Sequence, residues 1–177
     1  MARSGTSSVL TLMIAHGGPP AGADFITRTG ALTDPRTGQL YPANARERLF
    51  ARVPAVAARD YVYAQMAAGA AAIQRAGGVV GIGAHGNYPG IGTHWEMQAH
   101  AAGGMRPHEV LRAATLGSAT AIGRQQDLGS LEPGKRADFV VLDANPLADV
   151  ANALRIDAVV KDGHRYAATE LIRDPSP

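Results

Sequence analysis

The stretch of sequence that decides the fold is Val79-Val-Gly-Ile-Gly-Ala-His-Gly-Asn-Tyr-Pro-Gly-Ile-Gly-Thr-His-Trp-Glu-Met97. Residues 79–84 form an apolar run typical of a short buried strand, and a glycine-rich loop carrying His85 follows. We expect regular structure to resume at Thr93, in a helix that holds Glu96 in its first turn. In α/β proteins, a strand that delivers a polar residue into such a loop before a helix commonly builds a site. The stretch therefore predicts a site at the carboxyl end of a strand.

A second apolar run, residues 9–15, fits a strand buried on both faces and ends at His16. Residues 17–58 are rich in Gly, Pro and Arg and predict a long loop with short helical pieces. A helix is expected next, with Asp60 as its N-cap and a stop at Gly77. The order strand, helix, strand predicts a βαβ crossover and a parallel sheet. The expected fold class is therefore α/β.

The helix after the glycine-rich loop has the pattern of a capping box. Thr93 would accept a hydrogen bond from the backbone N–H of Glu96, whose carboxylate would reach back to the Thr93 N–H. This helix is expected to stop at residues 103–104, and a further helix is expected from Pro107 to Gly123. On this interpretation Glu96 is a structural cap.

The last third of the chain changes to a β pattern. Pro133 and Gly134 are placed as the central residues of a type II turn. Strands are expected over residues 137–143 and 156–161, and the dipeptide at 162–163 is a two-residue hairpin signal. The sequence therefore predicts a small antiparallel unit after the helices.

Composition limits the class of protein. The 177 residues are 46% hydrophobic and 18% charged, which is typical of one globular domain. The net charge of +2 comes from interspersed acids and bases, so neither a nucleic-acid groove nor a polybasic membrane surface is expected. The absence of cysteine excludes disulfides and thiolate metal sites. With no signal pattern and no apolar run of membrane-spanning length, a cytoplasmic protein is expected.

Two runs in the second half carry a family resemblance. They are Met105-Arg-Pro-His-Glu-Val-Leu-Arg-Ala-Ala-Thr115 and Leu128-Gly-Ser-Leu-Glu-Pro-Gly-Lys-Arg-Ala-Asp-Phe-Val-Val-Leu-Asp143. Together with residues 83–97 they resemble the C-terminal part of amidohydrolase-superfamily enzymes, in the imidazolonepropionase-like branch. The resemblance extends from about residue 9 to residue 166.

The resemblance implies a (β/α)8 TIM-like barrel with a small β-sandwich domain that is built from both chain ends. Residues 9–15 would then be the seventh strand and residues 79–84 the eighth. Residues 1–125 would form this part of the barrel, and residues 126–177 the C-terminal share of the composite β-domain and a tail. Active sites of such barrels lie at the carboxyl ends of the strands.

The resemblance also implies chemistry. Family members hydrolyse carbon–nitrogen bonds other than peptide bonds, usually in small cyclic amides, with water activated by one or two divalent metals, zinc being the expected ion. Their ligands include a His-x-His pair on the first strand and an Asp on the eighth. This sequence has no His-x-His pair, and His85 stands at or next to the position of that Asp. The chain alone is therefore not expected to bind a metal stably.

The candidate site residues follow from this placement. His85 is the candidate catalytic residue and metal ligand, because an imidazole can bind a metal or exchange a proton near neutral pH. Its alternative role is a structural hydrogen bond within the loop. The candidate substrate-binding residues are His16, Asn87, Tyr88 and His94, and an exposed position at the helix start is the alternative for His94.

The remaining rings are given structural roles. Trp95 is expected to pack the start of its helix, with its N–H finding a partner. His100, His108 and His164 are expected at the surface. Gly81-x-Gly83 lacks the third glycine and the later acidic residue of a dinucleotide fingerprint.

Two classes of function remain open at this point. One is a metal-dependent amidohydrolase acting on a small cyclic amide. The other is a non-catalytic truncated or split fragment, or a small binding module. Both would need strands that this sequence does not contain, so a complementing N-terminal chain or self-association is expected.

Overall fold

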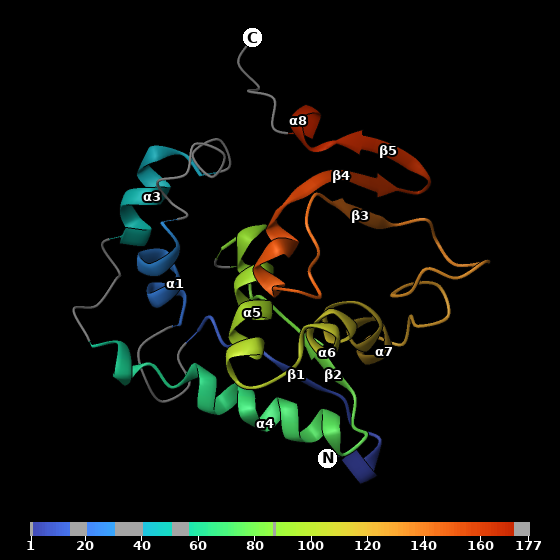
Figure 1. The fold of residues 1–177 in the computed structure, drawn as a ribbon, viewed down its shortest axis with the longest axis horizontal. Coiled ribbons are helices and arrows are strands. Elements are labelled where there is room, and N and C mark those ends of the chain that lie inside the picture. The colour runs from blue at the N-terminus through green and yellow to red at the C-terminus, as the bar shows by residue number, and fades with distance from the viewer. Residues whose placement is uncertain (1, 15–20, 31–40, 51–56, 87, 172–177) are drawn as a thin grey trace.

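The computed structural model describes residues 2–14, 21–30, 41–50, 57–86 and 88–171. Helices are the most abundant element in this part of the chain (Figure 1). They are η1 (Ala2–Ser4), α1 (Ala21–Thr29), α3 (Ala43–Phe50), η3 (Ala58–Asp60), α4 (Tyr63–Arg75), α5 (Ile91–Ala102), α6 (Pro107–Arg112), η4 (Ala113–Gly117), α7 (Ser118–Ala121), η5 (Val150–Leu154) and α8 (Ala168–Leu171).

Two separate sheets are present in the described residues. The strands β1 (Ser8–Leu10) and β2 (Val80–Ile82) form a parallel pair, with Ser8 opposite Val80 and Leu10 opposite Ile82. The strands β3 (Phe139–Leu142), β4 (Ile156–Lys161) and β5 (His164–Ala167) form an antiparallel sheet in that order. Figure 1 shows the two sheets at different ends of the molecule, with α5 between them. The predicted α/β class and parallel pairing are confirmed.

Both parallel strands are shorter than the apolar runs predicted. After β1 the chain turns at Leu12 and Met13, whose side chains are buried although their backbone leaves the sheet. After β2 the chain leaves the sheet at Gly83. The apolar runs therefore include residues that are buried but lie outside the strands.

The crossover helix α4 begins later than predicted. Its N-cap is Val62, and the carboxylate of Asp60 instead accepts a hydrogen bond from the Ala57 N–H at 3.1 Å. The prediction that Asp60 is the N-cap of this helix was therefore wrong. The predicted stop is confirmed, because Gly77 follows the helix with a φ of 82°, in the left-handed region that glycine adopts without strain.

The prediction of a capping box at Thr93 was also wrong. Helix α5 begins two residues earlier, at Ile91, and its N-cap is Gly90 with a φ of 74°. Thr93 therefore lies inside the helix, and Glu96 is too far along it to cap the first turn. The glycine N-cap lets the chain turn sharply out of the loop into the helix. The helix ends at Ala102 with Gly103 as its C-cap, as predicted.

The helix predicted from Pro107 to Gly123 has three parts. Pro107 is at the start of α6, and a capping box joins Arg106 and Glu109. The π-helical segment η4 then packs on β2 so closely that a Cβ at Gly117 would overlap the carbonyl oxygen of Val80. The wider helical turn and the glycine together let helix backbone contact strand backbone.

Two hydrophobic clusters form the core. The first surrounds the end of β1 and contains Leu12, Met13, Phe25 and Trp95 among its buried members. The second lies between α4, α5 and α6, and Val150 from η5 belongs to it. The segment before β4 is therefore packed on the helices of the first half.

The antiparallel sheet follows the sequence prediction closely. Strand β4 has the predicted bounds, and the hairpin residues Asp162 and Gly163 have φ values of 49° and 81°, as a two-residue turn requires. Strand β3 lies at one edge of the sheet and exposes apolar side chains, with Val140 52% exposed. None of the helices in the described ranges has the length and apolar character needed to cross a bilayer.

Candidate functional site

The carboxyl ends of β1 and β2 meet at one edge of the parallel pair. Because the strands run in the same direction, residues 11–14 and residues 83–86 leave the sheet side by side. The second segment is the glycine-rich loop that precedes α5. This is the edge at which α/β proteins place ligands.

His85 lies in this loop with an exposed side chain and a φ of 54°. Gly86 follows with a φ of 78°. A histidine in the left-handed region costs about 1 kcal/mol or more, and such residues are found disproportionately at functional sites. The backbone therefore presents the imidazole to solvent at the end of β2.

Tyr88, from the same loop, lies against Trp95 at a ring centroid distance of 5.2 Å. A Cβ at Gly22 would overlap the Tyr88 ring, so the start of α1 packs directly against this ring. Tyr41 donates a hydrogen bond of 2.5 Å from its hydroxyl to the carbonyl oxygen of Pro89. The loop is thus fixed by segments that precede α4 in the chain.

His94 is half-buried in the first turns of α5. Burial lowers the pKa of its imidazole, so the neutral form is favoured. Its Nδ1 is buried and has no hydrogen-bond partner in the part of the chain that the structure describes. The predicted site residues His16 and Asn87 lie outside the described residues.

Glu96 has a different place from the one predicted. Its side chain is fully buried, and its two carboxylate oxygens accept hydrogen bonds from the backbone N–H groups of Leu12 at 2.9 Å and Met13 at 2.8 Å. Burial raises the pKa of this carboxyl to about 7, although the Met13 and Leu12 N–H groups oppose the shift. Glu96 therefore joins α5 to the end of β1.

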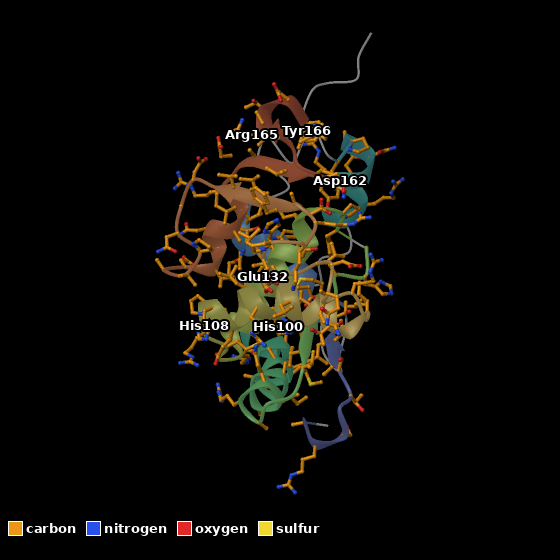
Figure 2. The ribbon with its side chains drawn as sticks, turned by 90° about the vertical axis from the view of Figure 1, so that its right-hand side faces the viewer. His100, His108, Glu132, Asp162, Arg165 and Tyr166 are labelled. Carbon is orange, nitrogen blue, oxygen red and sulfur yellow. The ribbon has the colours of Figure 1, made fainter. Side chains whose placement is uncertain are left out.

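The prediction that His100 lies at the surface was wrong. Its side chain is fully buried, and its Nδ1 donates a hydrogen bond of 2.8 Å to the carbonyl oxygen of Glu96. Burial lowers the pKa of this imidazole. Figure 2 shows His100 in the middle of the molecule, well away from Asp162 and Tyr166 at the β4–β5 end. The exposed position of His108 is confirmed.

Trp95 packs the start of α5, as predicted. Its ring is fully buried and stacks on Phe25 at a centroid distance of 5.8 Å. The prediction that its N–H finds a hydrogen-bond partner was wrong, since Nε1 is buried without one among the described residues.

A signal for the buried face of α5 was present in the sequence. The buried positions recur at spacings of three and four along the helix, which is the pattern of a helix face turned to the core. They include Gly92, Trp95, Glu96, Ala99 and His100. Read this way, Glu96 and His100 would have been expected inside the molecule despite their polar side chains.

A metal centre is not assembled by the described residues. Within them, no group of three His, Asp or Glu side chains lies close enough to bind one ion. His85 would be a single ligand, and structural and catalytic zinc sites use three or four protein ligands. The described residues therefore do not fit the ligand set that the resemblance implies.

Comparison with known proteins gives a consistent result. The model of the amidohydrolase family matches residues 7–165. Imidazolonepropionase from Shouchella clausii is 47% identical over 62 residues, which are 33% of this chain and 14% of that protein. A 5-methylthioadenosine/S-adenosylhomocysteine deaminase from Teredinibacter turnerae is 36% identical over 74 residues, which are 41% of this chain and 17% of that protein.

Solved structures show the same fold. The crystal structure of an amidohydrolase matches 94% of this chain with a TM-score of 0.56 at 24% identity. The match covers 35% of that amidohydrolase. The chain therefore spans about a third of the structural neighbour and a smaller part of the curated relatives.

Proposed function

This chain belongs to the amidohydrolase family, in its imidazolonepropionase-like branch, and we propose that it forms one wall of a hydrolase site for carbon–nitrogen bonds. The observation that carries the proposal is the strained, exposed His85 at the carboxyl edge of a parallel strand pair. Family members hydrolyse small molecules at this edge of their barrels. The chain spans only part of its relatives, so the activity is proposed for the assembly to which it contributes.

We place β1 and β2 as the seventh and eighth strands of a (β/α)8 barrel. Their parallel pairing and the α4 crossover support this assignment. On this division, residues 1–125 belong to the barrel and residues 126–177 to a composite β-sandwich domain and its tail. The antiparallel sheet of β3, β4 and β5 supports the second part.

The proposed substrate is a small cyclic amide or a related ring, bound in front of the loop that carries His85. His85 would transfer a proton at this edge, while Tyr88, Asn87, His94 and His16 are proposed to contact the substrate. Burial lowers the pKa of His94, so its proposed contact with the substrate would be made by a neutral imidazole.

A divalent metal, with zinc expected, would activate the water in the whole assembly. The described residues do not supply its ligand set, so the ligands would have to come from elsewhere in that assembly. The remaining strands would come from a complementing N-terminal chain, or self-association would cover the exposed surfaces. The exposed apolar residues of β3 support a covering partner, with Phe139 38% and Val140 52% exposed.

The test compares the chain alone with the chain co-expressed with the N-terminal remainder of an imidazolonepropionase, with Zn²⁺ supplied. Ring opening of small cyclic amides is followed by absorbance. We expect hydrolysis in the complemented sample, a loss of about 100-fold or more in His85→Ala, and no loss in His108→Ala. Equal rates in wild type and His85→Ala would overturn the role of His85. Hydrolysis by the chain alone would overturn the need for a partner, and a zinc-loaded complex without hydrolysis would overturn the activity.

A further inference from the structure

A buried carboxylate joins two segments that are far apart in the sequence. Glu96 lies 84 residues after Leu12 and 83 residues after Met13, and it accepts one hydrogen bond from the backbone N–H of each. Both bonds are shorter than 3 Å, and the side chain is fully buried. Leu12 and Met13 are the residues at which the chain turns away from the end of β1.

The carboxylate is one link in a closed ring of contacts. The carbonyl oxygen of Met13 accepts a hydrogen bond of 3.3 Å from the N–H of Gly22, at the start of α1. Gly22 in turn lies directly against the ring of Tyr88, in the loop that carries His85. The carbonyl oxygen of Tyr88 accepts a hydrogen bond of 2.7 Å from Gly92, one helical turn before Glu96. The ring therefore runs from α5 through both strand-end segments and back to α5.

A glutamate suits this position better than its amide would. Two adjacent backbone N–H groups point at the side chain, and a carboxylate offers an oxygen to each of them. The side chain of glutamine has one oxygen and one NH2 group, so one N–H would face another donor. A buried donor without an acceptor is costly, so the ring would have to rearrange.

Glu109 provides a matched comparison within the same protein. Its carboxylate also accepts a backbone N–H bond, from Arg106 at 2.7 Å, but both residues belong to the start of α6. Glu109 therefore stabilises its own helix, and its side-chain hydrogen bonds within the described residues go to Arg106 and not to either strand-end segment. The two glutamates differ in the sequence separation of the residues that they join: Glu109 bonds within one helix start, whereas Glu96 bonds to a distant segment.

From these contacts we propose that Glu96 is a positioning residue of the proposed site. Its carboxylate fixes the segment after β1 against the loop that carries His85, and so sets the geometry of the site wall. The inference rests on the proposed function, because Glu96 can position a site only if the site exists. The contacts themselves can be tested without any assay of activity.

The experiment follows backbone amide signals and the His85 ring signals by NMR in the isotope-labelled full chain. In Glu96→Gln we expect shifted amide signals for Leu12, Met13 and Gly92, together with shifted ring signals of His85. Amide hydrogen exchange at Leu12 and Met13 should rise by about tenfold or more, because one buried hydrogen bond is lost. The matched variant Glu109→Gln should leave all of these signals in place and move only those near Arg106.

Two results would overturn the proposal. In one, Glu96→Gln shifts Leu12 and Met13 but leaves the His85 ring signals unmoved, so that Glu96 only anchors β1. In the other, Glu109→Gln moves the His85 signals as far as Glu96→Gln does. Should Glu96→Gln not fold, Glu96→Asp gives the same comparison, since its carboxylate is one methylene too short to keep both bonds. All these results are independent of whether hydrolysis is ever observed, so failure of the proposed function would not decide them.

Discussion

Two regions of the molecule are stabilised by contacts of very different sequence separation. One is the carboxyl edge of the β1–β2 pair, and the other is the antiparallel sheet of β3, β4 and β5. At the edge, the buried bonds of Glu96 reach residues 83 and 84 positions away. In the sheet, the β4–β5 hairpin closes with Lys161 opposite His164. The first region depends on distant segments arriving together, whereas the second is encoded largely by neighbouring residues.

This difference explains why the edge can serve as a site. Loop segments joined by a few buried polar bonds can differ between relatives while the strands beneath them stay the same. The hairpin has less freedom, because its turn residues and its cross-strand register specify each other. The following variants change one region and use the other as the reference.

The largest effect is expected from Glu96→Ala. This change leaves the N–H groups of Leu12 and Met13 buried without acceptors, at about 2 kcal/mol each. The free energy of unfolding should therefore fall by about 4 kcal/mol, measured by urea denaturation. The exposed Glu132, changed to alanine as a control, should cost less than about 0.5 kcal/mol. An equal loss in the two variants would contradict the account.

The free energy of unfolding should also depend on pH through the titration of the Glu96 carboxyl. Because burial raises the pKa of Glu96 from 4.5 to about 7, the native state binds more protons than the unfolded state between those values. Stability must then fall as the pH rises through that window, by up to about 3 kcal/mol. The measurement is the difference in unfolding free energy between wild type and Glu96→Gln from pH 4.5 to 7. The buried His94 and His100 titrate in both proteins and cancel, and parallel curves would show that Glu96 does not titrate this way.

Gly22→Ala tests the contact between α1 and the loop. The added methyl group would overlap the Tyr88 ring, which would have to move, at about 2 kcal/mol. Gly69→Ala is the control, since its methyl group meets open space in the middle of α4. That control should gain about 0.5–1 kcal/mol from helix propensity. Thermal melts of the two variants should therefore shift in opposite directions, and a stabilised Gly22→Ala would contradict the packing.

The smallest effect is expected from Gly163→Ala in the hairpin. The φ of 81° at this position disfavours a residue with a Cβ, at about 1 kcal/mol. Changes in amide signals should stay within residues 137–167, because the strain is local. Shifts at Leu12 or Met13 would show that the two regions are coupled.

The sequence predicted the elements that depend on local chemistry. The bounds of β4, the glycine stop after α4, the start of α6 at Pro107 and the parallel strand pair are as predicted. The resemblance to the amidohydrolase family is confirmed by the match over residues 7–165. These features follow from turn residues, from periodicity and from a closing motif, all of which are written in contiguous residues.

The sequence failed where a side chain bonds to a distant segment. The spacing of Thr93 and Glu96 satisfies the local rule for a capping box, but the structure uses Glu96 for Leu12 and Met13. His100 was predicted at the surface but is buried on the same face of α5 as Glu96, although its own hydrogen bond, to the Glu96 carbonyl oxygen, is local. Local propensity cannot identify the partner of a buried polar group when that partner lies more than 80 residues away.

On this proposal, the Glu96 carboxylate holds the edge of the site independently of the antiparallel sheet. Native-state amide hydrogen exchange of wild type and Glu96→Ala, in denaturant too dilute to unfold the chain, tests it most directly. We expect faster exchange at Leu12, Met13 and Gly92, with the amides of β4 and β5 still exchanging at rates set by their own hairpin. A uniform acceleration over both regions, or unchanged exchange at Leu12 and Met13, would contradict it.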